Sequence, residues 1–123
     1  MDASRESLGA ATYAVSTRLE GATHVVSVTG SIQWEHADEF QDYLPTLINA
    51  ETPNLVLDFS ALKFINSSGL SALLAAHRQA REHGGELRLA TKQGDIIRLL
   101  HITRVDALIQ VHETPEDALA AIA

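Results

Sequence analysis

A short, almost continuous apolar segment, LVLDF, occupies residues 55–59 near the middle of the chain. A turn signal, TPN at residues 52–54, comes directly before it. Apolar runs of this length are typical of strands that are covered on both faces in the centre of a parallel sheet. Because such a strand needs helices on both sides of the sheet, the segment predicts an α/β fold.

Two strands are predicted before this segment. Alternate residues of segment 13–19 fall on one face, which is the periodicity of a strand. Residues 20–22, EGA, form a turn, and the β-branched residues 24–29 predict a second strand. Gly30 and Ser31 are expected to end it. The sequence therefore predicts a hairpin at the N-terminal side of the sheet.

Helices are predicted between and after these strands. Apolar residues recur at helical spacing over residues 35–49, where Pro45 predicts a kink or a break. A long helix is predicted after residues 66–69 and is expected to end near His83, before two glycines. The remaining segments alternate as strand, helix, strand and helix over residues 86–90, 95–101, 107–111 and 115–122. This order predicts a central, mostly parallel sheet covered by about four helices.

Size and composition limit the class of protein. The 123 residues leave room for one domain, expected at residues 12–123, after a small and polar segment, 1–11, that is expected to be a flexible tail. The absence of cysteine excludes disulfides and thiolate catalysis. The formal charge of −7 argues against nucleic acid as a partner. We see no secretory signal and no long apolar run, so we expect a cytoplasmic protein without membrane insertion.

Patterns typical of metal, nucleotide and catalytic sites are missing. The six histidines form neither an HxxxH nor an HExxH pair, so no metal site is predicted. Neither GxxxxGK[ST] nor GxGxxG occurs, so no nucleotide cofactor is predicted. Ser67 and Ser68 lie on a strand-to-helix turn, where nucleophiles occur, but NSSG is not the GxSxG pattern of such a turn. We expect no enzyme and no cofactor; labelling by a fluorophosphonate would test the serine-hydrolase hypothesis.

The most informative stretch is NSSG, at residues 66–69, where a helix is predicted to start. One interpretation is that Asn66 or Ser67 caps the helix by accepting hydrogen bonds from its free N–H groups. The other interpretation is a phosphoacceptor serine. A phosphate would add about −1.5 to −2 charges beside the positive helix end, which tolerates it, whereas a docked partner would lose affinity. The residues alone leave both interpretations open.

The run from residue 55 to residue 90 resembles the STAS family, in particular the bacterial anti-sigma factor antagonists. In that family an apolar strand, an Asp and a spacer precede Asp-Ser-Ser-Gly-Leu at a helix start. The same frame here reads LVLDFS at residues 55–60 and FINSSGL at residues 64–70. Three weaker motifs match in the same order, so that the resemblance spans about residues 12–122: GSI at 30–32, GGEL at 84–87 and TPEDAL at 114–119.

The resemblance implies a binding module without catalysis. Unphosphorylated family members capture a serine kinase that is also an anti-sigma factor. They release it when phosphorylated on the first serine of the motif, and a PPM-type phosphatase restores them. Carried over, the phosphoacceptor is Ser67, and Ser68 is a cap or a contact. The partner-binding residues that the resemblance implies are Gln33, Asn66, Ser67, Ser68, Gly69 and Leu70.

Two positions depart from the family pattern. The Asp before the acceptor serine is Asn66 here, and the Asp of the early turn is Gln33. Both changes keep hydrogen-bonding capacity but remove a charge. They motivate an alternative hypothesis, a STAS scaffold that is not phosphorylated and serves as a subunit of a stress-signalling or lipid-transport complex.

Overall fold

The computed structural model describes residues 13–122. The expected tail, residues 1–11, lies outside the described residues. The elements, in chain order, are β1 (Tyr13–Glu20), β2 (Thr23–Ile32), α2 (Trp34–Tyr43), the 3₁₀ turn η1 (Leu44–Leu47), β3 (Asn54–Asp58), β4 (Leu62–Ile65), α3 (Ser67–Glu82), β5 (Leu87–Ala90), α4 (Gly94–Ile102), the 3₁₀ turn η2 (Val105–Ala107), β6 (Gln110–His112) and α5 (Pro115–Ile122).

The strands form one six-stranded sheet in the order β1-β2-β3-β5-β6, and β4 also pairs with β2. Only the β1–β2 hairpin is antiparallel, and every other pair is parallel. β3 pairs with the first half of β2 and β4 with its last residues, so β3 and β4 follow one edge of β2. The predicted α/β class, the N-terminal hairpin, the mostly parallel sheet and its four covering helices are confirmed.

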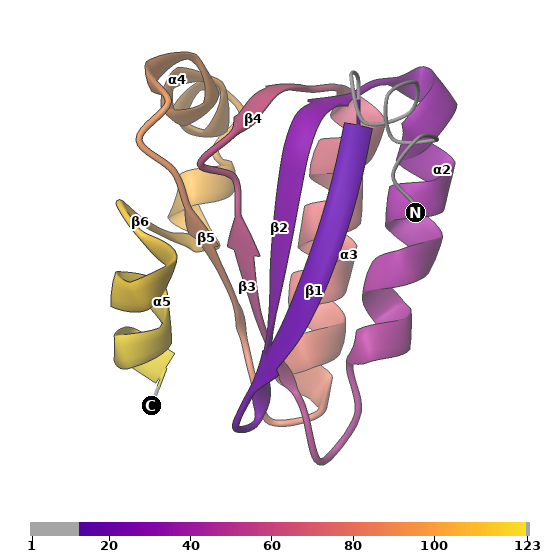
Figure 1. The fold of residues 1–123 in the computed structure, drawn as a ribbon, viewed down its shortest axis with the longest axis vertical. Helices are drawn as coiled ribbons and strands as arrows, with labels where there is room; N and C mark the ends of the chain where they lie inside the picture. Colours follow the sequence, from indigo (N-terminus) through magenta and orange to yellow (C-terminus); the bar gives the residue numbers. More distant parts are fainter. Residues whose placement is uncertain (1–12, 123) are drawn as a thin grey trace.

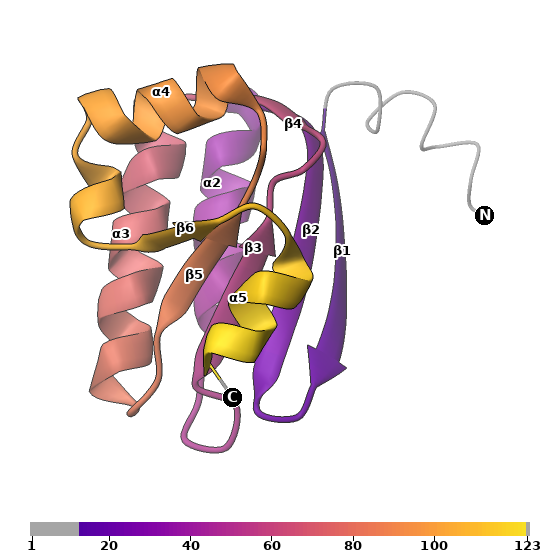
Figure 2. The same cartoon turned by 90° about the vertical axis from the view of Figure 1, so that its left-hand side faces the viewer.

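The central strand β3 is buried on both faces, as its apolar sequence predicts. Leu55 and Leu57 belong to the larger core, which α2 and α3 cover behind the sheet in Figure 1. Val56 points the other way and packs with Val25 against Ala118 of α5. α5 thus covers the opposite face over β3 and β5 (Figure 2). α4 lies at the end of the sheet where the parallel strands finish (Figures 1 and 2).

One strand was not predicted. No element is predicted between the strand at residues 55–59 and the helix after residues 66–69, but β4 lies there. Leu62 and Ile65 of β4 are buried while both residues between them are exposed, so the strand shows no two-residue periodicity. The predicted end of β2 at Gly30 is also wrong. The pairing register with β4 shifts after Gly30, whose φ is 85°, and this irregularity lets β2 continue to Ile32 beside β4.

Two further boundaries differ from the prediction. The helix expected at residues 35–49 ends at Tyr43, and the break predicted at Pro45 is confirmed as the turn η1. The strand expected at residues 107–111 is wrong in position, because the chain first forms η2 and then β6. Arg104, with a φ of 66°, ends the helical path before η2. Ile109, within the expected strand, is buried although it lies in no strand, so its burial does not reflect strand pairing.

His77 joins α3 to β5 and makes the stability of the fold depend on pH. Its Nδ1 accepts a hydrogen bond from the N–H of Leu87 at 3.2 Å. Burial lowers the pKa of His77, Arg81 lowers it further, and Glu86 opposes the shift. Because the folded pKa lies below the unfolded value of about 6.5, the unfolded chain takes up the proton more readily. The contribution of His77 is therefore present above that pH and is lost as the pH falls.

We expect the free energy of unfolding in urea to fall between about pH 7.5 and about pH 5.5, and to fall less in His77→Asn. The amide oxygen of asparagine can accept the same hydrogen bond but does not titrate in this range. The difference between the two proteins removes the effect of the other histidines. An equal fall in both would contradict a role of His77.

Candidate functional site

Two helix starts meet at the C-terminal ends of β2 and β4. Gln33 follows β2 and precedes α2, and Asn66 follows β4 and precedes α3. Ile32 pairs with Ile65, and the N–H of Asn66 donates to the carbonyl oxygen of Ile32 at 2.9 Å. The two positions at which the sequence departs from the family pattern thus lie at neighbouring strand ends. Residues from two distant motifs thus form one surface. We call the surface made by Gln33, Asn66, Ser67 and Ser68 the serine end of the molecule.

Asn66 is the residue that caps α3. Its backbone is extended, and its side-chain Oδ1 accepts a hydrogen bond from the N–H of Gly69 at 2.8 Å. This contact decides between the two capping residues that the sequence left open, and it leaves the Ser67 side chain without a capping role. Gln33, the corresponding residue of α2, makes no capping hydrogen bond with its side chain.

The capping contact predicts a specific pattern of stability. Asn66→Ala removes the acceptor and should lower the free energy of unfolding by about 1 kcal/mol. Asn66→Asp keeps the acceptor oxygen and adds a negative charge at the positive helix end, so it should be at least as stable as wild type. Urea unfolding at pH 7 measures both variants. Equal losses in both would show that the amide oxygen does not cap α3.

Ser67 and Ser68 are the first two residues of α3, and both side chains are exposed. Neither hydroxyl has a hydrogen-bond partner among residues 13–122. The Ser67 hydroxyl is thus open to an enzyme that approaches from solvent. The N–H groups of the first helical turn and the positive end of the helix dipole lie beside it, and both favour an added anion.

Gly69 and Leu70 lie beneath this surface and not on it. Both are buried, and only 8% of Leu70 is exposed. A Cβ atom on Gly69 would lie 2.6 Å from Cγ1 of Ile65 and 3.0 Å from Cγ2 of Ile32. The absent side chain therefore lets α3 begin in close contact with the ends of β2 and β4. These two residues set the position of the serines and offer little area for direct contact.

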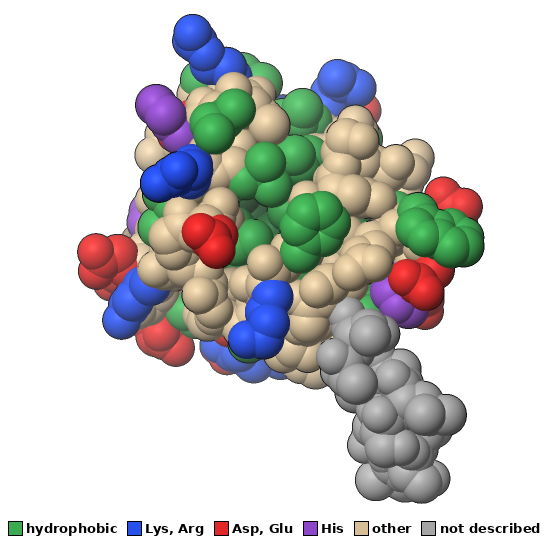
Figure 3. Space-filling model, turned by 90° about the horizontal axis from the view of Figure 1, so that it is seen from above, with side chains coloured by type: hydrophobic (Ala, Val, Ile, Leu, Met, Phe, Trp, Pro, Cys, Tyr) green, Lys and Arg blue, Asp and Glu red, His purple; other side chains and the backbone are tan. Residues whose placement is uncertain are grey.

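Large apolar side chains are exposed on the elements next to the serine end: Trp34 begins α2, Phe64 belongs to β4, and Ile97 lies on α4, which contacts β4. Trp34, Phe64 and Ile97 are 80%, 47% and 42% exposed. Figure 3, which looks onto this end, shows hydrophobic side chains in its middle and a separate group on the α2 side with acidic groups beside it. The exposure of Phe64 could not be predicted because β4 has no alternating pattern. Trp34 could have been noticed, because it is a large apolar residue in the first turn of a helix otherwise rich in acidic residues.

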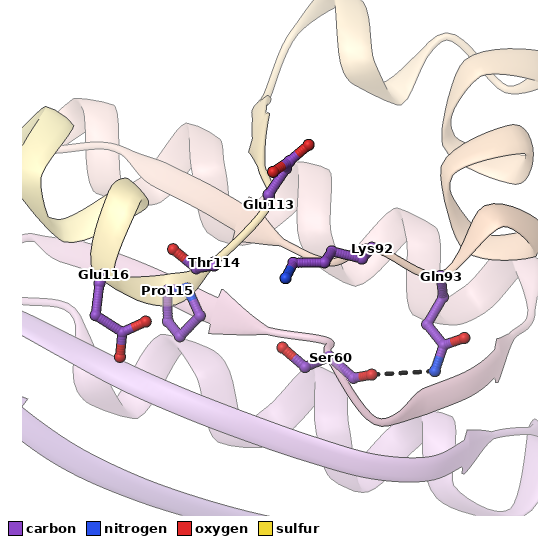
Figure 4. Close-up of a pocket in the computed structure, with 7 residues that line it drawn as sticks. All are labelled: Ser60, Lys92, Gln93, Glu113, Thr114, Pro115 and Glu116. Carbon is purple, nitrogen blue, oxygen red and sulfur yellow. Dashed lines mark hydrogen bonds between the residues drawn. The ribbon is translucent and has the colours of Figure 1, made fainter.

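A shallow hollow of about 440 Å³ lies where β3, β5 and β6 end. It is lined by Ser60, Lys92, Gln93, Glu113, Thr114, Pro115 and Glu116. In Figure 4 the Lys92 side chain extends into it, and Gln93 Nε2 donates to the carbonyl oxygen of Ser60 at 3.0 Å. Thr114 caps α5 by accepting from the N–H of Asp117 at 3.1 Å, so the capping hydroxyl is already engaged.

Within residues 13–122, no group of three or more His, Cys, Asp or Glu side chains is placed to hold a metal ion. Over the same residues, no helix is both long enough and apolar enough to span a membrane.

Comparison with known proteins gives the family. The STAS domain model matches residues 13–118, and the chain therefore belongs to the STAS domain family. It is 24% identical over 99 residues to the anti-sigma-F factor antagonist RsfA of Mycobacterium tuberculosis, a match that covers 79% of this chain and 77% of that protein. The resemblance drawn from the central motif is confirmed.

Solved structures agree with this assignment. An anti-sigma factor antagonist from Mycobacterium paratuberculosis superposes with a TM-score of 0.81 at 25% identity, over 90% of this chain and 94% of that one. The unphosphorylated form of the anti-sigma factor antagonist SpoIIAA superposes with a TM-score of 0.77 at 17% identity, over 89% of this chain and 96% of that one. At that identity the second match speaks for the fold alone.

Proposed function

We propose that this chain is an anti-sigma factor antagonist that acts by binding and not by catalysis, in the cytoplasm. In its unphosphorylated form it captures an anti-sigma factor that is also a serine kinase, and phosphorylation of Ser67 releases that partner. The observation that carries the proposal is the exposed Ser67 hydroxyl at the first position of α3, in a STAS domain whose named relatives are anti-sigma factor antagonists.

The chain supplies an acceptor and a surface, and separate enzymes supply the chemistry. The kinase transfers the terminal phosphoryl group of ATP to Ser67 Oγ; ADP leaves, and the hydroxyl proton passes to a base of the kinase. A PPM-type phosphatase hydrolyses the phosphoserine and returns the serine and inorganic phosphate. The new group carries about −1.5 to −2 charges and a strongly held hydration shell. The helix end tolerates that charge, whereas a partner packed against the serine end would have to desolvate it.

The expected partner-binding residues divide into two roles. Gln33, Ser67 and Ser68 are exposed and contact the partner directly, and half-buried Asn66 holds the helix start. Gly69 and Leu70, which are buried, keep that helix start against the strand ends. Asn66 adds no charge beside the phosphate, so the phosphorylated form of this chain meets less local repulsion than it would beside an aspartate.

The test has two steps. The tagged chain is used to recover partners from an extract of its native cells, and the recovered kinase is purified. Kinase, ATP and antagonist are then combined, and the intact mass is measured for wild type, Ser67→Ala and Ser68→Ala. We expect a gain of one phosphoryl group in wild type and in Ser68→Ala and none in Ser67→Ala. An equal gain in all three would reject Ser67 as the acceptor.

One observation favours a second candidate function. Asn66 and Gln33 place two amides at the serine end, where the family pattern has two acids. A STAS scaffold that is never phosphorylated would need no charge at these positions. Recovery of subunits of a stress-signalling or lipid-transport complex, with no kinase among them, would favour the scaffold over the antagonist.

A further inference from the structure

The net negative charge of the chain comes from one stretch of its sequence. No Lys or Arg occurs from residue 19 to residue 62, a stretch that contains seven acidic residues. The nine acidic residues elsewhere balance all nine basic ones, so this stretch carries the full formal charge of −7. It includes β2, α2 and β3. Four of its seven acids lie on α2, whereas Glu20 is paired with Arg18 and Asp58 is hydrogen-bonded at the end of β3, so the unpaired negative charge gathers on α2 and acts locally there.

Within that stretch, α2 carries its acids on the outer face. Glu35, Asp38, Glu39 and Asp42 recur at spacings of three and four residues, and all four are exposed. None of them forms an ion pair with a residue in the described part of the chain. Like charges at these spacings destabilise a helix, and Asp42 also lies in a last turn that has no basic residue. α2 therefore carries negative charge that no ion pair with the described residues compensates.

The inner face of α2 is fully engaged by the core. Ala37 and Phe40 are buried against it, and the ring of His36 stacks on Tyr13 with ring centroids 4.7 Å apart. Trp34 is the exception among the large apolar residues of α2, because it is 80% exposed at the helix start, directly after Gln33. It is the only tryptophan of the chain. Tryptophan is enriched among the residues that dominate binding energy at protein interfaces.

We propose that the outer face of α2, with Trp34 as its anchor, docks on a basic protein surface that has an apolar recess for the indole ring. This inference rests on the proposed function for the identity of that partner, the anti-sigma factor. Trp34 follows Gln33 and so joins the α2 face to the serine end, and one partner covers both. The acids of α2 attract Lys and Arg side chains of the partner and speed its approach, while burial of Trp34 slows its dissociation.

The first test uses the free protein, because Trp34 reports on its own surroundings by fluorescence. The ratio of caesium to iodide quenching constants should be higher for Trp34 than for free N-acetyltryptophanamide, since the acids of α2 concentrate cations and repel anions. The difference should shrink in Asp38→Asn/Asp42→Asn and should persist in the control Glu51→Gln/Glu113→Gln, which changes the charge equally elsewhere. A ratio in wild type equal to that of free N-acetyltryptophanamide would contradict a negative field at Trp34.

The second test measures the affinity of the purified partner by calorimetry. Trp34→Ala should weaken binding at least about tenfold, whereas Leu108→Ala, which removes another exposed apolar side chain outside the serine end, should leave it unchanged. Raising the salt concentration from about 0.05 M to about 0.5 M should weaken the wild-type complex and affect the Asp38→Asn/Asp42→Asn complex less. Circular dichroism confirms that each variant is folded.

The outcomes separate this inference from the proposed function. A kinase that binds wild type and Trp34→Ala with equal affinity would contradict docking on the outer face of α2 and leave the antagonist role intact. A partner that needs Trp34 and low salt but is neither a kinase nor an anti-sigma factor would support the docking face and refute the antagonist role. If Trp34→Ala changed only the self-association of the chain, as measured by light scattering, a second copy would be the occupant and the inference would be wrong.

Discussion

Replacing Ser67 with aspartate should weaken the complex with the recovered kinase at least about tenfold, a loss of about 1.4 kcal/mol. Ser67 is the first residue of α3, and its side chain is exposed at the serine end. A carboxylate there carries a charge that the helix end accepts but that a docked partner must desolvate without an added counter-charge. The effect falls short of phosphorylation because a carboxylate has less charge than a phosphate. Isothermal titration of the kinase with each variant measures it.

The matched control for this prediction is Ser67→Asn, which has almost the same shape as aspartate but no charge. It should bind close to the wild-type affinity. Equal weakening by asparagine and aspartate would assign the effect to size, and unchanged affinity in both would contradict a charge switch at Ser67. Neither substitution removes a contact that holds the fold, because the hydroxyl has no partner among the described residues and Asn66 provides the cap.

Replacing Gly85 with alanine should lower the stability of the domain by about 3 kcal/mol and its Tm by on the order of 10 °C. Gly85 lies between α3 and β5, and its N–H donates to the carbonyl oxygen of Ala80 at 2.8 Å. An added Cβ would collide with the carbonyl oxygen of Pro53 and lie 2.6 Å from Oδ1 of Asn54. The first of these atoms is backbone and cannot rotate away. The second accepts the N–H of Glu86 at 3.0 Å, where β5 begins to pair with β3.

Gly94→Ala is the control for this substitution. Gly94 is the first residue of α4, and a Cβ placed on it meets no atom within 4 Å. Alanine there should be neutral or slightly stabilising because it reduces the freedom of the unfolded chain. Thermal unfolding of both variants distinguishes a steric cause from a general cost of losing glycine. Similar Tm values for both would contradict the close approach at Gly85.

The parts of the fold that were predicted correctly depend on local signals. The strand at residues 55–59 could be predicted because burial on both faces demands an apolar run. The start of α5 could be predicted because Thr114 and Pro115 form a capping pattern that acts within one turn. The break at Pro45 follows from the geometry of proline itself. In each case the cause lies within a few residues of its effect.

The parts that were missed depend on pairing between distant segments. β4 is a strand because it lies beside the last residues of β2, although Lys63 and Phe64 are both exposed and hide its periodicity. β2 continues past Gly30 for the same reason. Ile109 is buried in the larger core without belonging to a strand, so the last strand, expected from residue 107, was placed too early.

For the candidate site, the local sequence was enough to predict that Ser67 stands at the start of a helix and that Asn66 or Ser67 caps it. The folded chain is needed to see that Asn66 is the cap and that Gln33 lies at the neighbouring strand end. It also shows that Gly69 and Leu70 are buried while Trp34 is exposed. The reason is physical. Helix starts and strand periodicity arise from neighbouring residues, whereas exposure and proximity arise from the pairing of β2 with β4 and the packing of α2 on α3, which bring together residues far apart in the chain.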